Sequence, residues 1–422
     1  MRIAIETFGC TANHADSQLM RELLERAGHS VVDGEADLYV VNTCTVVKAT
    51  ERRVMRRLRE LERRGVPYIV AGCLPAAQPE LLSELSPLAV LTPSTIQSIA
   101  DVVGVDYLKQ RGQEHHSPPS PPQSPHIIPI ARGCVGSCSY CIVKRARGHL
   151  RSVPETEVVA EVKRAVHWGI KEIHLTAQDV GAYGLDTKSS LARLLRKVCS
   201  VEGEFFVRVG MMNPSTVISQ ASELSEAFLH PKVFKFVHIP VQSGSDEVLS
   251  AMGRGYTVEQ FERLCTLFRE RLGECTLCTD VIVGYPTESE EDFERTLELI
   301  KRLEPDKLNI TRFSARPHTP AFRLSQLPDW IKKERSRRLT RLYMSITEKR
   351  QRRHVGKRMR VLVSERVREG SVVARDAAYR NVVIRGEYPI GAVLDVRVVR
   401  AHPMYLIAEP LDEAKAICIS VS

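Results

Sequence analysis

The sequence predicts an α/β protein in three parts: an amino-terminal open parallel sheet, a central partial (β/α)6 TIM-like barrel and a small carboxy-terminal antiparallel β-barrel. Three observations support this. Near the amino terminus, short apolar runs alternate with segments of helical spacing, and at least six such units follow between about 126 and 325. Beyond 355, five short β-branched runs come with glycines between them. Alternating units are typical of parallel sheets, whereas clustered short strands are typical of small barrels.

Length and composition limit the class of protein. A chain of 422 residues exceeds one ordinary domain, and 43% hydrophobic with 26% charged residues is typical of soluble globular proteins. No apolar run reaches membrane-spanning length, and the start MRIAIETFGC lacks a signal-peptide pattern. We therefore expect a cytoplasmic protein that does not contact a membrane.

The first predicted domain covers residues 1–112. Its apolar runs RIAIETFGC, DLYVVNTC and PYIVAGC each read as a strand that ends at a cysteine, namely Cys10, Cys44 and Cys73. Segments 14–28 and 46–64 have helical spacing, so the strands should be parallel. Since loops after parallel strands open at one edge of the sheet, these thiols can meet there. The alternative is that three of eleven cysteines fall at strand ends by chance.

A proline-rich linker is predicted at 113–125, because HHSPPSPPQSP offers no periodic apolar residues. The central domain then covers 126–354. Its strand-like runs number about six within roughly 200 residues, which is too few for a complete eightfold barrel. Polar residues at the carboxyl ends of barrel strands face the active site. In this chain they are Gln178, Asp179, Arg208, Asn213, Gln242, Ser243 and Asp280.

The most informative motif is CxxxCxxC at Cys134, Cys138 and Cys141. Three thiolates at this spacing can bind three irons of a four-iron cluster and leave the fourth iron open to a small molecule. The alternatives are a zinc site, which usually needs a fourth ligand and would find none before His149, or ordinary buried thiols. We interpret the five cysteines outside both sets as core residues: Cys199, Cys265, Cys275, Cys278 and Cys418.

Positive charge is concentrated before and within the last predicted domain, 355–415. Residues 331–360 hold thirteen Lys or Arg against Glu334 and Glu348, a local net charge of +11 when the whole chain carries +9. A solvated helix face usually mixes charge signs, and this segment does not. Beside a small β-barrel, such charge favours a nucleic-acid partner over a plain basic surface.

With its surroundings, IPIARGCVGSCSYCIVKRARG resembles the radical S-adenosylmethionine (SAM) superfamily, and FGCTANHADSQLM, VNTCTVVKATE and AGCLPAAQPE resemble the amino-terminal domain of its methylthiotransferases. LTAQDVGAYG, VRVGMMNP, HIPVQSGSDEVLSAMGRGYT and TDVIVGYPTESEEDF continue the likeness, and the final strands are similar to a TRAM domain. The resemblance implies SAM and two [4Fe-4S] clusters, one on each cysteine set. It also implies that Gly284 allows close backbone approach and that the SAM and substrate cavity is lined by Tyr140, Gln178, Asn213, Gln242, Ser243 and Asp280.

The resemblance is greatest to the archaeal and eukaryotic type, which adds a methylthio group at C2 of N6-threonylcarbamoyladenosine at position 37 of tRNA. It implies binding of the anticodon stem-loop, a flavodoxin or ferredoxin as electron donor, and a monomer; the sulfur donor stays open. Ala177 and Val153 depart from the common pattern near the substrate.

Four alternatives remain at this point. Two are sister enzymes that act on an isopentenyl-type adenosine of tRNA or on a ribosomal-protein aspartate. The third is a radical SAM enzyme that inserts no sulfur, and the fourth is a non-catalytic iron–sulfur protein that binds RNA.

Overall fold

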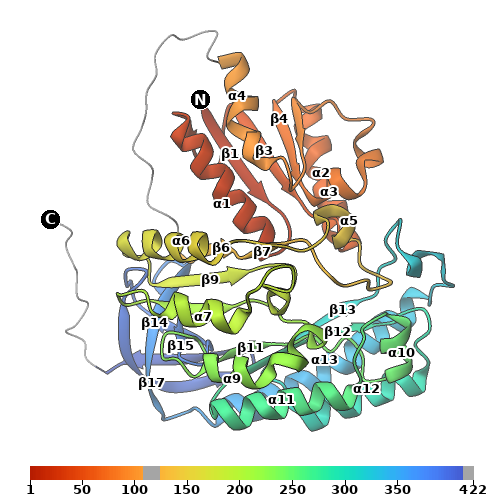
Figure 1. The fold of residues 1–422 in the computed structure, drawn as a ribbon, viewed down its shortest axis with the longest axis vertical. Helices are drawn as coiled ribbons and strands as arrows, with labels where there is room; N and C mark the ends of the chain where they lie inside the picture. Colours follow the sequence, from red (N-terminus) through yellow and green to blue (C-terminus); the bar gives the residue numbers. More distant parts are fainter. Residues whose placement is uncertain (108–123, 412–422) are drawn as a thin grey trace.

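The computed structural model describes residues 1–107 and 124–411 (Figure 1). Most of the predicted 113–125 linker and Cys418 therefore lie outside the described residues. Figure 1 shows three parts: an amino-terminal sheet with its helices, a central set of strands surrounded by helices, and a barrel at one end of the central set. That barrel has five strands. The predicted fold class is confirmed.

The amino-terminal sheet is parallel throughout, in the order β2-β1-β3-β4-β5. Its strands are Arg2–Thr7 (β1), Ser30–Val31 (β2), Leu38–Thr43 (β3), Tyr68–Gly72 (β4) and Ala89–Leu91 (β5). Helices α1 (Thr11–Arg26) and α4 (Ile99–Tyr107) cover one face, and α2 (Lys48–Arg63) covers the other. The short helix α3 (Cys73–Ala77) follows β4 directly. Because both faces are covered, β3 and β4 are buried along their whole length.

Six parallel strands form the central barrel, as the sequence predicts. They are His126–Pro129 (β6), Glu172–Thr176 (β9), Phe206–Val209 (β10), Phe236–His238 (β11), Thr276–Val283 (β12) and Lys307–Arg312 (β13). The ladders join β10-β9-β6 and β11-β12-β13, and the Met212 N–H donates to the His238 carbonyl at 2.9 Å between the two halves. No ladder joins β6 to β13 among the described strands, so the barrel is partial.

Helices with one apolar face pack outside these strands and share one core with them. They are Glu155–His167 (α6), Leu191–Cys199 (α7), Ala221–Phe228 (α9), Val258–Leu272 (α11) and Glu290–Leu303 (α12). Shorter elements connect them: Ala131–Arg132 (β7), Arg151–Ser152 (β8), Val143–Arg147 (α5), Pro214–Val217 (α8) and Asp246–Ala251 (α10). None of the helices in the described parts of the chain is both long and apolar enough to cross a lipid bilayer.

A 24-residue helix, α13 (Asp329–Arg352), leads from the barrel to the last domain. There five strands close into a barrel of order β14-β15-β16-β18-β17. They are Arg358–Arg368 (β14), Ser371–Asp376 (β15), Asn381–Arg385 (β16), Val393–His402 (β17) and Tyr405–Pro410 (β18). All pairs are antiparallel except β16 with β18, which is parallel because β18 returns from the β17 hairpin to close the barrel.

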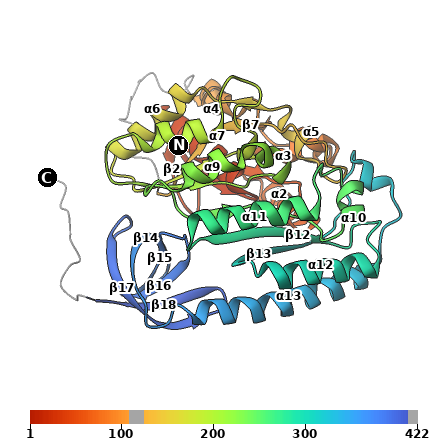
Figure 2. The same cartoon turned by 60° about the horizontal axis from the view of Figure 1, so that its bottom comes forward.

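This last domain is joined to the amino-terminal ends of the central strands (Figure 2). Tyr379, in the turn between β15 and β16, packs with Phe234, Phe236 and Cys278 of the central barrel. Its hydroxyl donates to Glu172 Oε1 at 2.8 Å, and the Lys235 N–H donates to the Ala377 carbonyl at 2.8 Å. The carboxy-terminal barrel therefore closes one end of the central barrel.

Candidate functional site

The loop between β7 and α5 carries Cys134, Cys138 and Cys141. It begins at Gly133, where φ is +76° and a Cβ would lie 1.9 Å from the His149 carbonyl oxygen, so only glycine fits. The Cys134 N–H donates to the Gly148 carbonyl at 3.1 Å. Farther along, the Ser139 hydroxyl donates to the Ala251 carbonyl at 2.9 Å. The loop is thus held at both ends, and its three thiols face one region.

The second thiol set meets at one edge of the amino-terminal sheet, where the sequence placed it. Cys10 precedes α1, Cys44 follows β3, and Cys73 begins α3. Gly9 has φ +126°, and a Cβ there would lie 2.7 Å from the Cys44 Cβ, so this glycine lets the first two cysteines approach. The side-chain oxygen of buried Asn13 lies 3.5 Å from the Cys10 Sγ and 3.9 Å from the Cys73 Sγ. Asn13 therefore contacts two of the three thiols of this set.

The spacing of the sulfur atoms decides which metal group each set suits. Among the described residues, only His238, Cys278 and Asp280 bring three ligand atoms within 4.8 Å of one another. A tetrahedral zinc ion would hold its thiolates about 4 Å apart. Neither cysteine set is drawn together that tightly, and all six thiols are free of disulfides. Each set is therefore wider than a mononuclear zinc site, and each offers three thiols, one for each of three irons of a four-iron cluster.

Burial raises the pKa of Cys134, and it raises the pKa of Cys141 to about 11. In the second set burial raises the pKa of Cys44, and it raises that of Cys73 to about 12. Thiols in such surroundings stay protonated unless positive charge compensates them, and metal ligation does so. The burial of these four thiols therefore suits metal ligation better than free thiol reactivity.

Arg254 is the central cation of the first set, and the sequence analysis missed it. Its guanidinium donates to the Cys138 Sγ at 3.3 Å, to the Asn213 Oδ1 at 2.9 Å and to the Tyr256 hydroxyl at 3.0 Å. It also lies 3.4 Å from the hydroxyl of Tyr140, one of the predicted residues. Arg254 is 7% exposed and has no carboxylate partner within the described ranges. A buried cation with this arrangement suits an anionic group beside the thiolates.

Two of the predicted glutamines have free buried acceptors. The Oε1 atoms of Gln178 and Gln242 have no hydrogen-bond partner in the described structure. Gln242 also has φ +74°, a conformation that costs a non-glycine residue energy and is enriched at functional sites. Its backbone is fixed by β12, since its N–H donates to the Asp280 carbonyl at 2.8 Å. Both side chains are therefore available to a ligand.

Other predicted residues are occupied by protein contacts. Ser243 is fully buried and accepts from the Ser245 N–H at 3.2 Å. Asp179 accepts from the Gly181 and Asn213 N–H groups at 3.0 and 2.9 Å, and burial raises its pKa to about 6. These two residues shape the loops that carry Gln178, Asn213 and Gln242.

Asp280 faces the inside of the barrel with His238 and Asn309. The His238 Nε2 lies 3.0 Å from the Asp280 Oδ1, and the Asn309 amide donates to the same oxygen at 2.6 Å. Despite burial, the neighbouring Cys278 and Asp280 raise the pKa of His238 to about 10. A protonated imidazole paired with a carboxylate accounts for this group without a metal ion.

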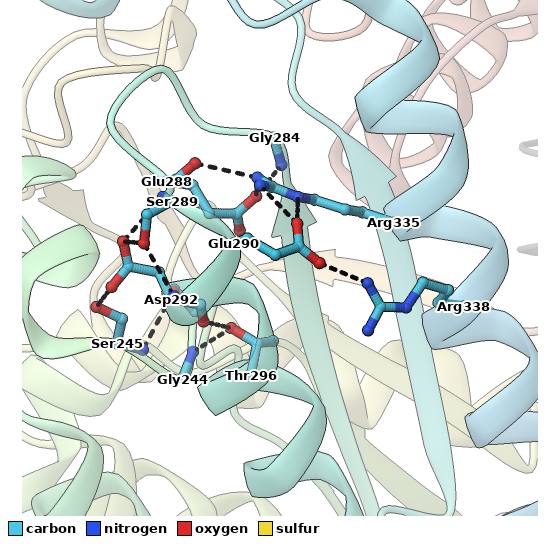
Figure 3. A network of polar contacts seen from close by, with 11 residues as sticks. Gly244, Ser245, Gly284, Glu288, Ser289, Glu290, Asp292, Thr296, Arg335 and Arg338 are labelled. Carbon is cyan, nitrogen blue, oxygen red and sulfur yellow. Dashed lines mark hydrogen bonds and ion pairs between the residues drawn. The ribbon is translucent and has the colours of Figure 1, made fainter.

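Gly284 lies close to a protein side chain, and its predicted close approach to a ligand stays a prediction. A Cβ at this position, where φ is +77°, would lie 2.5 Å from the Lys332 Cγ. Its N–H donates to the Glu288 Oε2 at 2.6 Å, and Glu288 pairs with Arg335 at 2.6 Å in a buried network (Figure 3). The same network reaches the Ser245 hydroxyl through Asp292. It holds the loop that carries Gln242 against α12 and α13.

A second missed residue, Arg147 in α5, connects the two thiol sets. It donates to the Asp16 Oδ2 at 2.7 Å and to the Asn13 Oδ1 at 3.3 Å, and both members of the Arg147–Asp16 pair are about 5% exposed. Cys73 and Ala77 of α3 pack on Ile142 and Ala146. Because α5 begins directly after the first cysteine set, it lies between the two sets.

The predicted basic patch at 331–360 is partly neutralised in three dimensions, so its free charge is smaller than the local count of +11. Long-range acidic residues such as Glu288, Glu290 and Glu304 were invisible to local counting. Seven of the thirteen basic residues form ion pairs: Lys332, Arg335, Arg338, Lys349, Arg350, Arg352 and Lys357. The other six are exposed and form no ion pair among the described residues: Lys333, Arg337, Arg341, Arg353, Arg358 and Arg360. Further exposed positive charge lies on the carboxy-terminal barrel.

The outer face of that barrel has a groove of about 760 Å³. Arg368, Arg385 and Arg400 line it together with Tyr405. The Tyr405 ring stacks on His402 with centroids 4.4 Å apart and 19° between the planes. Arginines with aromatic rings are the side chains that bind phosphates and stack on bases.

The remaining cysteines outside both sets are buried, as predicted, in the part of the chain that is described. Cys199 and Cys265 belong to the main core, Cys278 packs at the base of the barrel, and Cys275 directly precedes β12. None has more than 8% exposure.

Three family models match this chain in succession. They are "Uncharacterized protein family UPF0004" over residues 2–92, "Radical SAM superfamily" over 128–300 and "TRAM domain" over 352–411. Together they cover the three structural parts.

Curated relatives match over nearly the whole chain. A "Probable threonylcarbamoyladenosine tRNA methylthiotransferase" of Pyrococcus horikoshii is 42% identical, over 97% of this chain and 99% of its own length. The "Threonylcarbamoyladenosine tRNA methylthiotransferase" of Danio rerio is 34% identical, over 98% and 79%, and that of Homo sapiens is 32% identical, over 100% and 76%.

Among solved structures, the radical SAM methyltransferase TsrM of Kitasatospora setae is similar, with a TM-score of 0.55 and 16% identity, over 76% of this chain and 74% of that one. At this identity the likeness concerns the fold alone.

Proposed function

The chain belongs to the threonylcarbamoyladenosine tRNA methylthiotransferase family, and we propose that it adds a methylthio group at C2 of N6-threonylcarbamoyladenosine in tRNA. The position in the tRNA would be 37, in the anticodon loop. Two observations together carry the proposal: the full-length relatedness to these enzymes, and two sets of three free cysteines joined by α5. A radical SAM enzyme without sulfur insertion would need only the set at Cys134.

In the proposed active site, Cys134, Cys138 and Cys141 hold a four-iron cluster. The cluster and SAM, when bound, supply the carbon radical that activates a C–H bond which is not acidic enough for acid–base chemistry. Arg254 neutralises charge at Cys138 and, with Tyr140 and Asn213, orients the SAM. The free oxygens of Gln178 and Gln242 accept hydrogen bonds from bound SAM or substrate. Asp280 lies in the cavity wall in this proposal, and Ser243 and Gly284 support that wall through their contacts with Ser245 and Lys332.

We propose that Cys10, Cys44 and Cys73 hold the second four-iron cluster. Three ligands leave one iron for the sulfur that is transferred, so this set has a task separate from radical formation. Asn13 and Arg147 fix the geometry, because each contacts the cysteine set and Arg147 comes from the segment that follows Cys141. Movement of α5 would therefore change both sites together.

For the tRNA we propose contacts with the groove on the carboxy-terminal barrel. Arg368, Arg385 and Arg400 would bind phosphates, and Tyr405 would stack on a base. We further propose a cytoplasmic monomer that receives electrons from a flavodoxin or ferredoxin. The chain's own residues do not favour one sulfur donor.

The experiment separates the two cysteine sets. The full-length protein is reconstituted anaerobically as wild type, Cys10→Ala, Cys138→Ala and Cys275→Ala, and iron, 5′-deoxyadenosine and modified nucleoside are measured. Cys10→Ala should still form 5′-deoxyadenosine but give no methylthio product, whereas Cys138→Ala should give neither. Cys275→Ala, which belongs to neither set, is the control and should resemble the wild type. Methylthiolation by Cys10→Ala would refute the role of the second set.

A further inference from the structure

Arg208 is a cation in the central barrel without a carboxylate partner. It lies on β10, and its buried Nε has no hydrogen-bond partner in the described structure. Its guanidinium stacks on Phe236 and Tyr379, with the Cζ 4.8 and 5.3 Å from the ring centroids. Stacking uses the face of the guanidinium and leaves its N–H edge free. The group is therefore held in place and able to donate hydrogen bonds.

The neighbouring acidic groups are already occupied. Glu172 accepts from the Tyr379 hydroxyl at 2.8 Å and lies 2.7 Å from the His174 Nε2. Asp280 is engaged by His238 and Asn309. A second cation, Lys307, points its Nζ at the same two rings, 5.3 and 5.6 Å from their centroids, and makes no ion pair in the described structure. The negative charge of Glu172 offsets one of these two cations, and the other positive charge has no ion-pair partner in the described structure.

Arg208 lines a cleft of about 570 Å³ to which all three domains contribute. The amino-terminal domain supplies α1 residues that begin at Thr11, directly after Cys10. The central barrel supplies His174 and Arg208, and the carboxy-terminal barrel supplies Arg366. Burial lowers the pKa of both His14 and His174, so these imidazoles are neutral in the cleft. Most of the side chains that line the cleft are polar, and the carboxylate among them, Glu365, is already paired with Arg375.

We propose that Arg208 binds the threonine carboxylate of the substrate adenosine, with the threonylcarbamoyl side chain lying in this three-domain cleft. The proposal rests on the proposed function and specifies its substrate contact. A planar guanidinium matches a carboxylate with two parallel hydrogen bonds, and threonylcarbamoyladenosine has one free carboxylate. An isopentenyl group has no such charge and would leave Arg208 buried and unpaired. Arg208 is thus a specificity residue that selects the acidic modification.

The test uses three anticodon stem-loops that differ only at position 37: threonylcarbamoyladenosine, its threonine methyl ester and unmodified adenosine. Binding to the full-length protein is measured by fluorescence anisotropy, and product formation by nucleoside mass spectrometry. For the wild type we expect the acid to bind about 10- to 100-fold more tightly than the ester, the range for a charge-assisted pair. This comparison needs no protein variant, so misfolding cannot obscure it.

Two variants then locate the effect. Arg208→Met keeps much of the stacking volume and should bind acid and ester equally, without changing affinity for the unmodified loop. Arg366→Gln, in the same cleft on the carboxy-terminal barrel, should weaken all three loops alike. Discrimination that survives in Arg208→Met, or its absence in the wild type, overturns the proposal. If the wild type discriminates but forms no methylthio product, the carboxylate site stands and the proposed function is refuted.

Discussion

Replacement of Tyr379 should separate the carboxy-terminal barrel from the central one. The side chain is 6% exposed, and its ring lies 4.8 and 5.3 Å from the centroids of Phe234 and Phe236. Truncation of a buried aromatic side chain to alanine costs about 3–5 kcal/mol. Tyr379→Phe keeps the ring but removes the hydrogen bond to Glu172, which would leave a buried charge less well solvated and cost about 1–3 kcal/mol.

The measurement is equilibrium urea unfolding of the apoprotein, followed by circular dichroism and by protection of Phe236 and its neighbours from hydrogen exchange. Tyr405→Ala is the matched control, because Tyr405 lies on the outer face of the same barrel and stacks on His402. We expect the control to change stability by less than about 1 kcal/mol but to weaken RNA binding, since each stacked base contributes about 1–3 kcal/mol. A loss below about 1 kcal/mol in Tyr379→Ala would refute this account of the domain junction.

Three further predictions concern the site and its support. Gly133→Ala should abolish iron binding at Cys134, because the new Cβ would lie 1.9 Å from the His149 carbonyl oxygen. Gly148→Ala is the control: its φ is similar, but no atom lies within 4 Å of its Cβ position, so this variant should retain iron. Equal iron contents in the two variants would contradict the prediction. Arg147→Met should destabilise the apoprotein by about 3–5 kcal/mol in urea unfolding, because it leaves buried Asp16 unpaired. Arg164→Met breaks two partly exposed pairs, with Glu22 and Glu161, and should cost less than about 1 kcal/mol. Similar losses for the two variants would refute the distinction. Burial alone would raise the pKa of Glu172, but the hydrogen bond from His174 outweighs it and lowers this pKa to about 2. The ionised Glu172 therefore contributes about 3 kcal/mol to the free energy of unfolding above pH 4.5, and this contribution is lost as the pH falls towards 2. Glu172→Gln should flatten the acid-unfolding profile of the apoprotein. An unchanged profile would contradict the prediction.

Local patterns predicted most of the fold. Periodic spacing located β1, β3 and β4 of the amino-terminal sheet, the six barrel strands and the five last strands, but not the short edge strands β2 and β5. Cysteines at strand ends and at CxxxCxxC spacing located both thiol sets. The association of Cys10, Cys44 and Cys73 followed from parallel-sheet geometry. These features depend on residues that are close in sequence or on one general rule of topology.

Long-range pairing could not be predicted in the same way. Arg254 stands inside the quoted run MGRGYT, yet nothing local shows that it reaches Cys138, 116 residues away. Arg147 and Asp16 meet across two domains. The basic segment 331–360 was interpreted as a free patch because Glu288 and Glu304 are distant in sequence but adjacent in the fold. The signal available for Arg254 was its position in a motif of the barrel.

The most direct test of the whole account is one anaerobic reaction. The reconstituted protein is incubated with SAM, dithionite and a tRNA that carries unmethylthiolated threonylcarbamoyladenosine, and the digested nucleosides are analysed by mass spectrometry. The account predicts a 2-methylthio adduct on threonylcarbamoyladenosine together with 5′-deoxyadenosine. If 5′-deoxyadenosine forms without the adduct, the substrate assignment is wrong; if neither forms although both clusters are intact, the enzymatic function itself is contradicted.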